Sequence, residues 1–198
     1  MSNKSKEVVI VSAIRTPIGT YKGSLKEMRS DQLGSIVIKE VLKKIEFVGN
    51  EIDEIIMGQV LTAGAGQNPA RQAAISAGIP ISKPAHIINQ VCGSGLRAVI
   101  SGYQSIKLGE ASNIIAGGQE SMSMAPYSIF YRNEKKFSED ELFDTMINDG
   151  LTDAFNNYHM GVTAENIAKK FNISRQEQDE FALNSQKKTE LAISSNRF

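Results

Sequence analysis

The only cysteine of the chain, Cys92, lies in the stretch NQVCGSGLRAV, which covers residues 89–99. A strand-like apolar run precedes this thiol and a helix-like pattern follows it. A thiol at the first turn of a helix lies near exposed backbone N–H groups and the positive end of the helix dipole, which favour the reactive thiolate. Gly93 and Gly95 leave room for a substrate carbonyl, and a backbone N–H beside a nucleophile can bind the oxyanion that forms on attack. Because a lone intracellular cysteine is also commonly an inert core residue, the spacing leaves both a nucleophile and a buried hydrophobe open.

Other candidate residues give weaker signals. The stretch GAGQNPA from Gly64 lacks the third glycine of a dinucleotide fingerprint, so a nucleotide site there is a minor hypothesis. His86 lies in a predicted strand, where a single histidine is usually a satisfied core group. His159 and Met160 lie in NYHMGVTAEN, within a helical region. A single cysteine cannot by itself make a zinc site, so we expect no metal site.

Charge and hydropathy exclude several classes of protein. Basic and acidic side chains number 22 each, so no net field favours nucleic acid or an anionic membrane surface. No apolar run reaches the roughly 20 residues that a membrane-spanning helix needs. The N-terminal stretch MSNKSKEVVIVSA lacks the long apolar core of a signal peptide, which predicts a cytoplasmic protein.

Four short runs rich in β-branched residues are the candidate strands that would position the thiol. They are continuous rather than alternating in hydropathy, which is typical of strands covered on both faces. The runs cover residues 8–11, 55–57, 87–91 and 113–116.

Predicted helices separate these strands. One is capped by Asp31 and ends near Gly49, a second covers residues 68–78, and a third begins at Cys92 or Gly93 and runs to about residue 108. This order predicts a parallel sheet with helices on its faces. Ligands bind at the carboxyl ends of the strands in such sheets, and Cys92 follows one of those ends.

The character of the chain changes after residue 118. Residues 119–198 offer helices and loops but no clear strand, and Ser174 with Glu177 forms a capping box for a helix that reaches about residue 194. We therefore expect an α/β domain over residues 1–118 and a helical segment over residues 119–198.

Several stretches together resemble the thiolases, and specifically the short-chain acetyl-CoA acetyltransferases. The resemblance covers essentially the whole chain and follows the family in order and spacing. The stretches that carry it are VVIVSAIRTPIG, GQVLTAGAGQNPARQAA, NQVCGSGLRAV, AGGQESMSMAPY and DGLTDAFNNYHMGVTAENIAKK.

The resemblance implies a thiolase-like N-terminal layered α/β unit with a helical loop-domain insertion, whose part at 119–198 carries the CoA site and oligomer contacts. It implies that Cys92 attacks an acyl-CoA thioester and holds the acyl group, while its own N–H helps to bind the oxyanion. Leu151, His159 and Met160 correspond to residues that line the pantetheine and acyl pocket. His159 is therefore expected to contact substrate, and it is not assigned as the base that activates Cys92.

The implied reaction condenses two acetyl-CoA into acetoacetyl-CoA and CoA, or runs the reverse thiolysis. Coenzyme A enters as a substrate or product, no separate cofactor is expected, and the intact protein is expected to form a homodimer or homotetramer. Members of the family are longer, and their second half supplies a histidine, a second cysteine and an asparagine that move protons and position water. We therefore expect this chain alone to be inactive, and to expose the helix face with Leu96, Val99 and Ile100. A non-catalytic thiolase-scaffold module, one subunit of a split thiolase, and a nucleotide-binding α/β domain remain alternatives.

Overall fold

The structure is a computed structural model that describes residues 7–131 and 138–197. It divides into two compact units, one that ends at Gly150 and one that begins at Leu151, and each is described here by itself.

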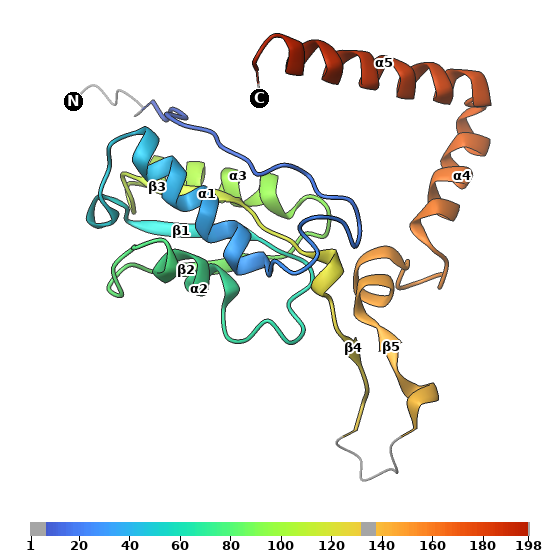
Figure 1. The fold of residues 1–198 in the computed structure, drawn as a ribbon, viewed down its shortest axis with the longest axis horizontal. Helices are drawn as coiled ribbons and strands as arrows, with labels where there is room; N and C mark the ends of the chain where they lie inside the picture. The colour runs from blue at the N-terminus through green and yellow to red at the C-terminus, as the bar shows by residue number, and fades with distance from the viewer. Residues whose placement is uncertain (1–6, 132–137, 198) are drawn as a thin grey trace. The chain divides into compact units, whose positions relative to one another are not determined.

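The first unit is built on a parallel three-stranded sheet in the order β2-β1-β3 (Figure 1). Its strands are β1 (Glu54–Gly58), β2 (Ala85–Ile88) and β3 (Ile114–Gly118). Gly58 pairs with Ile88 on one side and with Gly118 on the other, so the carboxyl ends of the three strands lie level with one another. This confirms the predicted strands at 55–57 and 113–116 and the parallel α/β class.

Helices cover both faces of the sheet (Figure 1). They are α1 (Ser30–Lys44), α2 (Pro69–Ser76) and α3 (Ser94–Leu108). Ile55 and Met57 of β1 belong to one core cluster with side chains of α1 and α2. Ile56 is buried outside that cluster, on the face where α3 packs, because successive side chains of a strand point to opposite faces.

The ends of α2 follow the predicted signals. The Asn68 side chain accepts a hydrogen bond from the Arg71 N–H at 3.1 Å, Pro69 opens the helix, and Gly78 lies beyond its end with φ of +91°. The start of α1 differs from the prediction, because Arg29 is the N-cap and Asp31 lies in the first turn. The Asp31 carboxylate pairs with Arg29 at 2.7 Å instead of capping the helix.

The predicted strand at 8–11 is wrong. These residues belong to no strand, and Val9, Ile10 and Val11 are 64%, 78% and 70% exposed. Hydropathy detects an apolar run, but a strand also needs a hydrogen-bonding partner, and the sheet of the described residues has the order β2-β1-β3. The run predicted at 87–91 is displaced, since β2 already ends at Ile88 and a tight turn follows it.

Residues 119–150 contain more extended structure than the sequence predicts. A short antiparallel pair joins β4 (Tyr127–Ser128) and β5 (Phe143–Asp144), and the rings of Phe130 and Phe143 stack at 5.3 Å. In the same stretch, short 3-10 turns lie at Met122–Met124 and Glu139–Glu141, and a π-helical segment covers Met146–Leu151. A further 3-10 turn, Gly49–Glu51, lies before β1.

The second unit is helical. It contains α4 (Met160–Phe171) and α5 (Arg175–Ser194), and neither helix has a buried residue. The predicted capping box of α5 is confirmed, since the Ser174 N–H donates to Glu177 at 2.7 Å and the Ser174 Oγ accepts from the Glu177 N–H at 3.2 Å.

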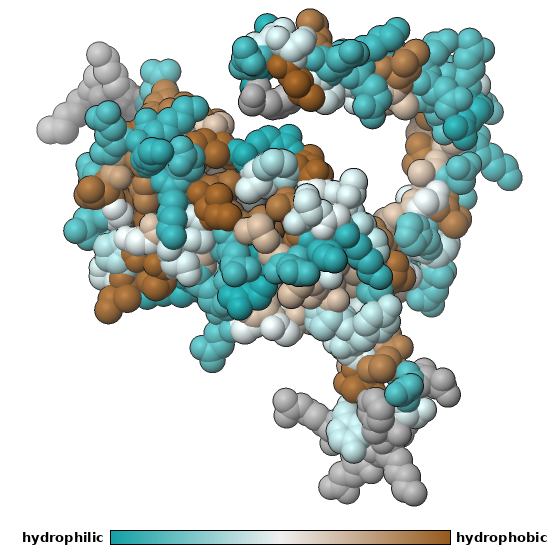
Figure 2. Space-filling model, in the orientation of Figure 1, coloured by the Kyte–Doolittle hydropathy of each residue, from teal (hydrophilic) through white to brown (hydrophobic). Residues whose placement is uncertain are grey.

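Apolar side chains reach the surface in both units (Figure 2). On α3, Leu96 is 69% exposed and Ile100 is 39% exposed, as predicted, while Val99 is half-buried. Within the described ranges, no helix combines the length and the apolar character of a membrane span.

Candidate active site

Cys92 lies on a tight turn between the carboxyl end of β2 and the start of α3, and its thiol is free and exposed. The Gly93 N–H donates to the Gln90 carbonyl at 3.1 Å, and the Ser94 N–H donates to the Val91 carbonyl at 3.1 Å. Helix α3 begins at Ser94 with Gly93 as its N-cap, so Cys92 stands just before the helix and not within its first turn. The exposure of the thiol excludes the interpretation of Cys92 as a buried hydrophobe.

The backbone of this turn is strained at the residue before the thiol. Val91 has φ of +49°, in the left-handed region that β-branched residues avoid. The Val91 N–H donates to the Asn89 side chain at 2.9 Å, and the Gln90 N–H donates to the Ser94 Oγ at 2.8 Å. An isolated bridge between Gln90 and Cys92 also belongs to this turn.

Close backbone packing fixes this turn at the edge of the sheet. A Cβ atom at Gly58 would collide with the carbonyl carbon of Ser94 and would lie 2.5 Å from the Gly95 nitrogen. A Cβ atom at Gly118 would lie 3.4 Å from the Gly95 Cα. Glycine is therefore required at Gly58, where β1 meets the first turn of α3, and this contact holds the Cys92 turn at the carboxyl edge of the strands.

The three other predicted site residues, Leu151, His159 and Met160, belong to the second unit. An antiparallel bridge joins Thr152 to His159, so the loop between them brings Leu151 close to His159 and Met160. His159 is the N-cap of α4, and its Nδ1 accepts a hydrogen bond from the Gly161 N–H at 3.0 Å. A ring nitrogen that accepts carries no proton, so the ring proton lies on Nε2 and remains available to a ligand.

An Asx-type turn supports the same loop. The Asp153 carboxylate accepts hydrogen bonds from the Asn156 N–H at 2.6 Å and from the Phe155 N–H at 3.0 Å, and these donors, with that of Asn156 foremost, lower the pKa of Asp153. The Asp153 N–H in turn donates to the Tyr158 carbonyl at 2.9 Å. The loop that precedes His159 is thus closed by its own hydrogen bonds.

Residues 8–198 match the family model described as "Thiolase, N-terminal domain". The chain belongs to the thiolase family. The resemblance found in the sequence is thereby confirmed, together with the thiolase-like α/β class of the fold.

Three relatives illustrate how the thiolase match extends along the chain. It is 54% identical over 198 residues to an acetyl-CoA acetyltransferase of Rhizobium meliloti, covering 100% of this chain and 50% of the relative. A probable acetyl-CoA acetyltransferase of Escherichia coli is 52% identical over 194 residues, covering 98% and 49%. A cytosolic acetyl-CoA acetyltransferase of Rattus norvegicus is 49% identical over 198 residues, covering 100% and 50%. The chain spans about half the length of the curated relatives it matches.

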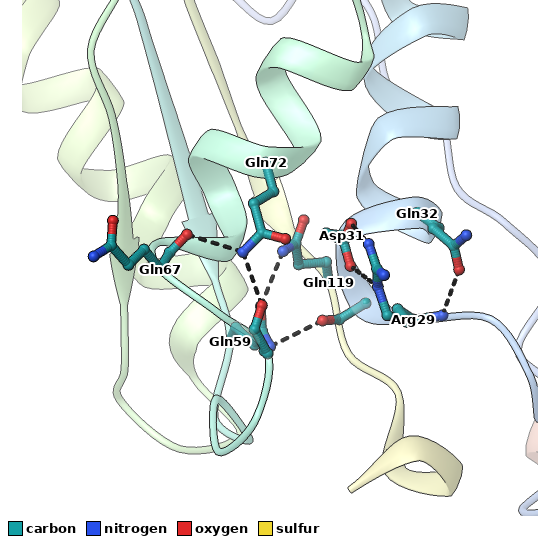
Figure 3. Close-up of polar contacts among 9 residues, drawn as sticks. Arg29, Asp31, Gln32, Gln59, Gln67, Gln72 and Gln119 are labelled. Carbon is teal, nitrogen blue, oxygen red and sulfur yellow. Dashed lines mark hydrogen bonds and ion pairs between the residues drawn. The ribbon is translucent and has the colours of Figure 1, made fainter.

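The thiolase domain also contains a buried amide network that sequence reasoning missed (Figure 3). The Gln119 amide donates to Gln59 Oε1 at 2.9 Å, and the Gln59 amide donates to the Ser30 hydroxyl at 2.9 Å and to the Leu61 carbonyl at 2.8 Å. Both glutamines are buried and directly follow the last glycines of β1 and β3. The repeated Gly-Gln pair at two strand ends is the signal that could have found them.

Glu120, which is half-buried, follows Gln119 beside this network. Its carboxylate accepts hydrogen bonds from the Val60 N–H at 2.9 Å and the Leu61 N–H at 3.2 Å, so it shapes the loop after β1. Burial raises the pKa of Glu120, although these backbone donors oppose the rise. Glu120 and the two glutamines therefore fix the loops that flank the carboxyl edge of the sheet.

His86 has a structural explanation within the thiolase fold. Its Nδ1 lies 3.1 Å from Glu54 Oε1 on the neighbouring strand, and its side chain is 46% exposed. The expectation of a core histidine is wrong, because His86 finds its partner at the surface of the sheet.

Proposed function

We propose that this chain supplies the nucleophile of an acetyl-CoA acetyltransferase of the thiolase type. The observation that carries the proposal is the exposed Cys92 thiol on a strained turn at the carboxyl edge of the sheet, in a chain that belongs to the thiolase family. An exposed nucleophile before a helix N-terminus is arranged for attack on an electrophilic carbonyl.

In the proposed reaction the Cys92 thiolate adds to the thioester carbonyl of acetyl-CoA. The bond between the acetyl carbon and the CoA sulfur then breaks, CoA leaves as the thiolate and takes up a proton, and the acetyl group remains on Cys92. A base removes a proton from the methyl group of a second acetyl-CoA, and the resulting carbanion attacks the carbonyl of the acetyl-cysteine. The bond between the acetyl carbon and Cys92 Sγ then breaks, which releases acetoacetyl-CoA and returns Cys92 to the thiolate. The backbone N–H of Cys92 is proposed to stabilise the oxyanion of the first step.

The second unit is proposed to bind the substrate. Leu151, His159 and Met160 would contact the pantetheine arm and the acyl group, and residues 119–198 would form part of the loop domain. The hydrogen bond to His159 Nδ1 supports this role, because it orients the ring and leaves the Nε2 proton for the substrate. It also agrees with the exclusion of His159 as the base.

The remaining parts of the proposal concern partners and location. Acetyl-CoA and acetoacetyl-CoA are the proposed ligands, with no separate cofactor or metal and no nucleic acid or membrane partner. We propose a homo-oligomer in the cytoplasm, supported by the exposed apolar face of α3 and by the similarity to the cytosolic acetyl-CoA acetyltransferase of Rattus norvegicus.

Intact-mass spectrometry after incubation with acetyl-CoA tests the proposal. We expect one acetyl group on the wild-type chain and none on the Cys92→Ala variant. Condensation is then tested by adding the C-terminal half of the Rhizobium meliloti relative and measuring acetoacetyl-CoA. Acetylation without condensation in this mixture would favour a scaffold role, and a chain that takes no acetyl group even in the mixture would contradict the proposal.

A further inference from the structure

We infer that Ser94 is a positioning residue for Cys92. Its buried hydroxyl holds Val91 in the left-handed conformation and thereby fixes the direction in which the turn presents the thiol. The inference rests on the proposed function of Cys92 and extends it to a residue that acts through the nucleophile.

The conformation of Val91 is the first step of the argument. Seven non-glycine residues of the described chain have positive φ, and among them only Val91 is β-branched. In this region the Cβ of an L-residue approaches the following carbonyl oxygen, and a branched side chain makes the crowding worse. Local preference would therefore move Val91 out of this conformation, so surrounding contacts must hold it there.

The Ser94 hydroxyl supplies the contact that fits this requirement. Its oxygen accepts a hydrogen bond from the Gln90 N–H at 2.8 Å, and its O–H donates one to the Val91 carbonyl at 2.6 Å. The Gln90 N–H and the Val91 carbonyl are the two ends of the Gln90–Val91 dipeptide. One side chain therefore fixes both ends of the dipeptide that contains the strained φ angle. Of the small side chains, only a hydroxyl can accept and donate at the same atom in this way.

Ser94 can act as a clamp because it is itself held in place. It is 4% exposed, and its backbone packs against Gly58 at the end of β1. Asn89 also binds the turn through the Val91 N–H, but Asn89 is exposed, so water competes for its hydrogen bond. The sheet therefore positions Ser94, Ser94 positions Val91, and Val91 positions Cys92.

The test uses the 198-residue chain with Ser94→Ala and a matched control, Ser30→Ala. Ser30 also has a buried hydroxyl with a hydrogen-bond partner, Gln59, but it lies on α1 outside the turn. The first measurement is the one-bond coupling between Cα and Hα of Val91 by NMR, which is sensitive to the sign of φ. The second is the rate of Cys92 acetylation by acetyl-CoA divided by its rate of alkylation with iodoacetamide.

We expect Ser94→Ala to lose the coupling typical of positive φ and to lower the rate ratio about tenfold, because acyl transfer depends on orientation more strongly than alkylation does. Ser30→Ala should change neither quantity. An unchanged coupling and ratio in Ser94→Ala would overturn the inference, as would an equal fall in Ser30→Ala.

The Val91→Gly variant provides a second test, which keeps the inference falsifiable if Ser94→Ala alone fails to fold. Glycine adopts positive φ without a clamp, so Ser94→Ala should leave the rate ratio unchanged when Val91→Gly is already present. A tenfold fall in that background would overturn the inference. If acetyl-CoA acetylates the wild-type chain neither alone nor in the mixture with the C-terminal half, the proposed function fails, while the Val91 coupling in Ser94→Ala still decides the role of the hydroxyl.

Discussion

The contact between Gly58 and α3 predicts that Gly58→Ala destabilises the chain and disturbs the turn that carries Cys92. The added Cβ would collide with the backbone of Ser94 and Gly95, and no side-chain rotation can relieve a collision with backbone atoms. Inserting atoms into such a packed contact costs about 1–3 kcal/mol. Alanine in a strand otherwise gains about 0.5–1 kcal/mol over glycine, so we expect a net loss of about 1–2 kcal/mol.

Gly117→Ala is the matched control for this substitution. Gly117 also lies in a parallel strand of the same sheet, but a Cβ there would meet no atom within 4 Å. We therefore expect Gly117→Ala to be neutral or to stabilise the chain by up to about 1 kcal/mol. The two substitutions add the same methyl group, so their difference isolates the collision with α3.

Urea unfolding followed by circular dichroism measures both effects. With a slope of about 2 kcal/mol per M, the Gly58→Ala midpoint should fall by about 0.5–1 M, whereas the Gly117→Ala midpoint should stay or rise. The iodoacetamide rate at Cys92 should also change in Gly58→Ala alone, because α3 must shift to admit the methyl group. Equal midpoints for the two variants would refute the packing argument.

Four further predictions concern charge and the thiol. Burial raises the pKa of Glu120 above its unfolded value of 4.5. The wild-type free energy of unfolding should therefore fall as the pH rises through the range above 4.5. Glu120→Gln should flatten this pH dependence, which urea titrations at several pH values measure. Glu120→Ala at pH 7 should instead cost about 1–3 kcal/mol, because the Val60 and Leu61 N–H groups lose their acceptor; a neutral effect would contradict the assigned bonds. The hydrogen bond from Arg29 lowers the pKa of Asp31, so the contribution of this carboxylate to the free energy of unfolding is present above pH 3.8 and is lost as the pH falls further. Asp31→Asn should remove this acid-dependent part of the stability. An acid profile identical to that of the wild type would refute the prediction. Finally, iodoacetamide should label Cys92 in the folded chain at least as fast as in the denatured chain, and protection on folding would contradict the exposed turn.

Much of the first unit could be predicted where local chemistry decides the structure. Asn68, Pro69 and Gly78 fix both ends of α2 through a cap, a preset φ and a left-handed exit, and all three signals act within a few residues. In the second unit, the capping box of Ser174 and Glu177 is equally local, because its two residues are three apart in sequence. Such features depend little on distant parts of the chain.

The errors have a different physical origin. The run at 8–11 has the composition of a strand, but pairing depends on a partner that no local pattern specifies. The left-handed Val91 runs against the preference of its own residue type, so propensity points away from it. The bond between Gln59 and Gln119 joins residues 60 apart in sequence, and only the register of β1 with β3 brings them together.

The single exposed thiol has a consequence for the redox chemistry of the chain. With one cysteine, a disulfide can form only between two molecules, and a covalent dimer of two 21.6 kDa chains would consume the nucleophile of both at once. Exposed thiols oxidise in air, so the fraction of chains able to accept an acetyl group should fall during storage and recover on reduction. The amount of acetyl bound per chain should therefore follow the amount of reduced sulfur rather than the amount of protein.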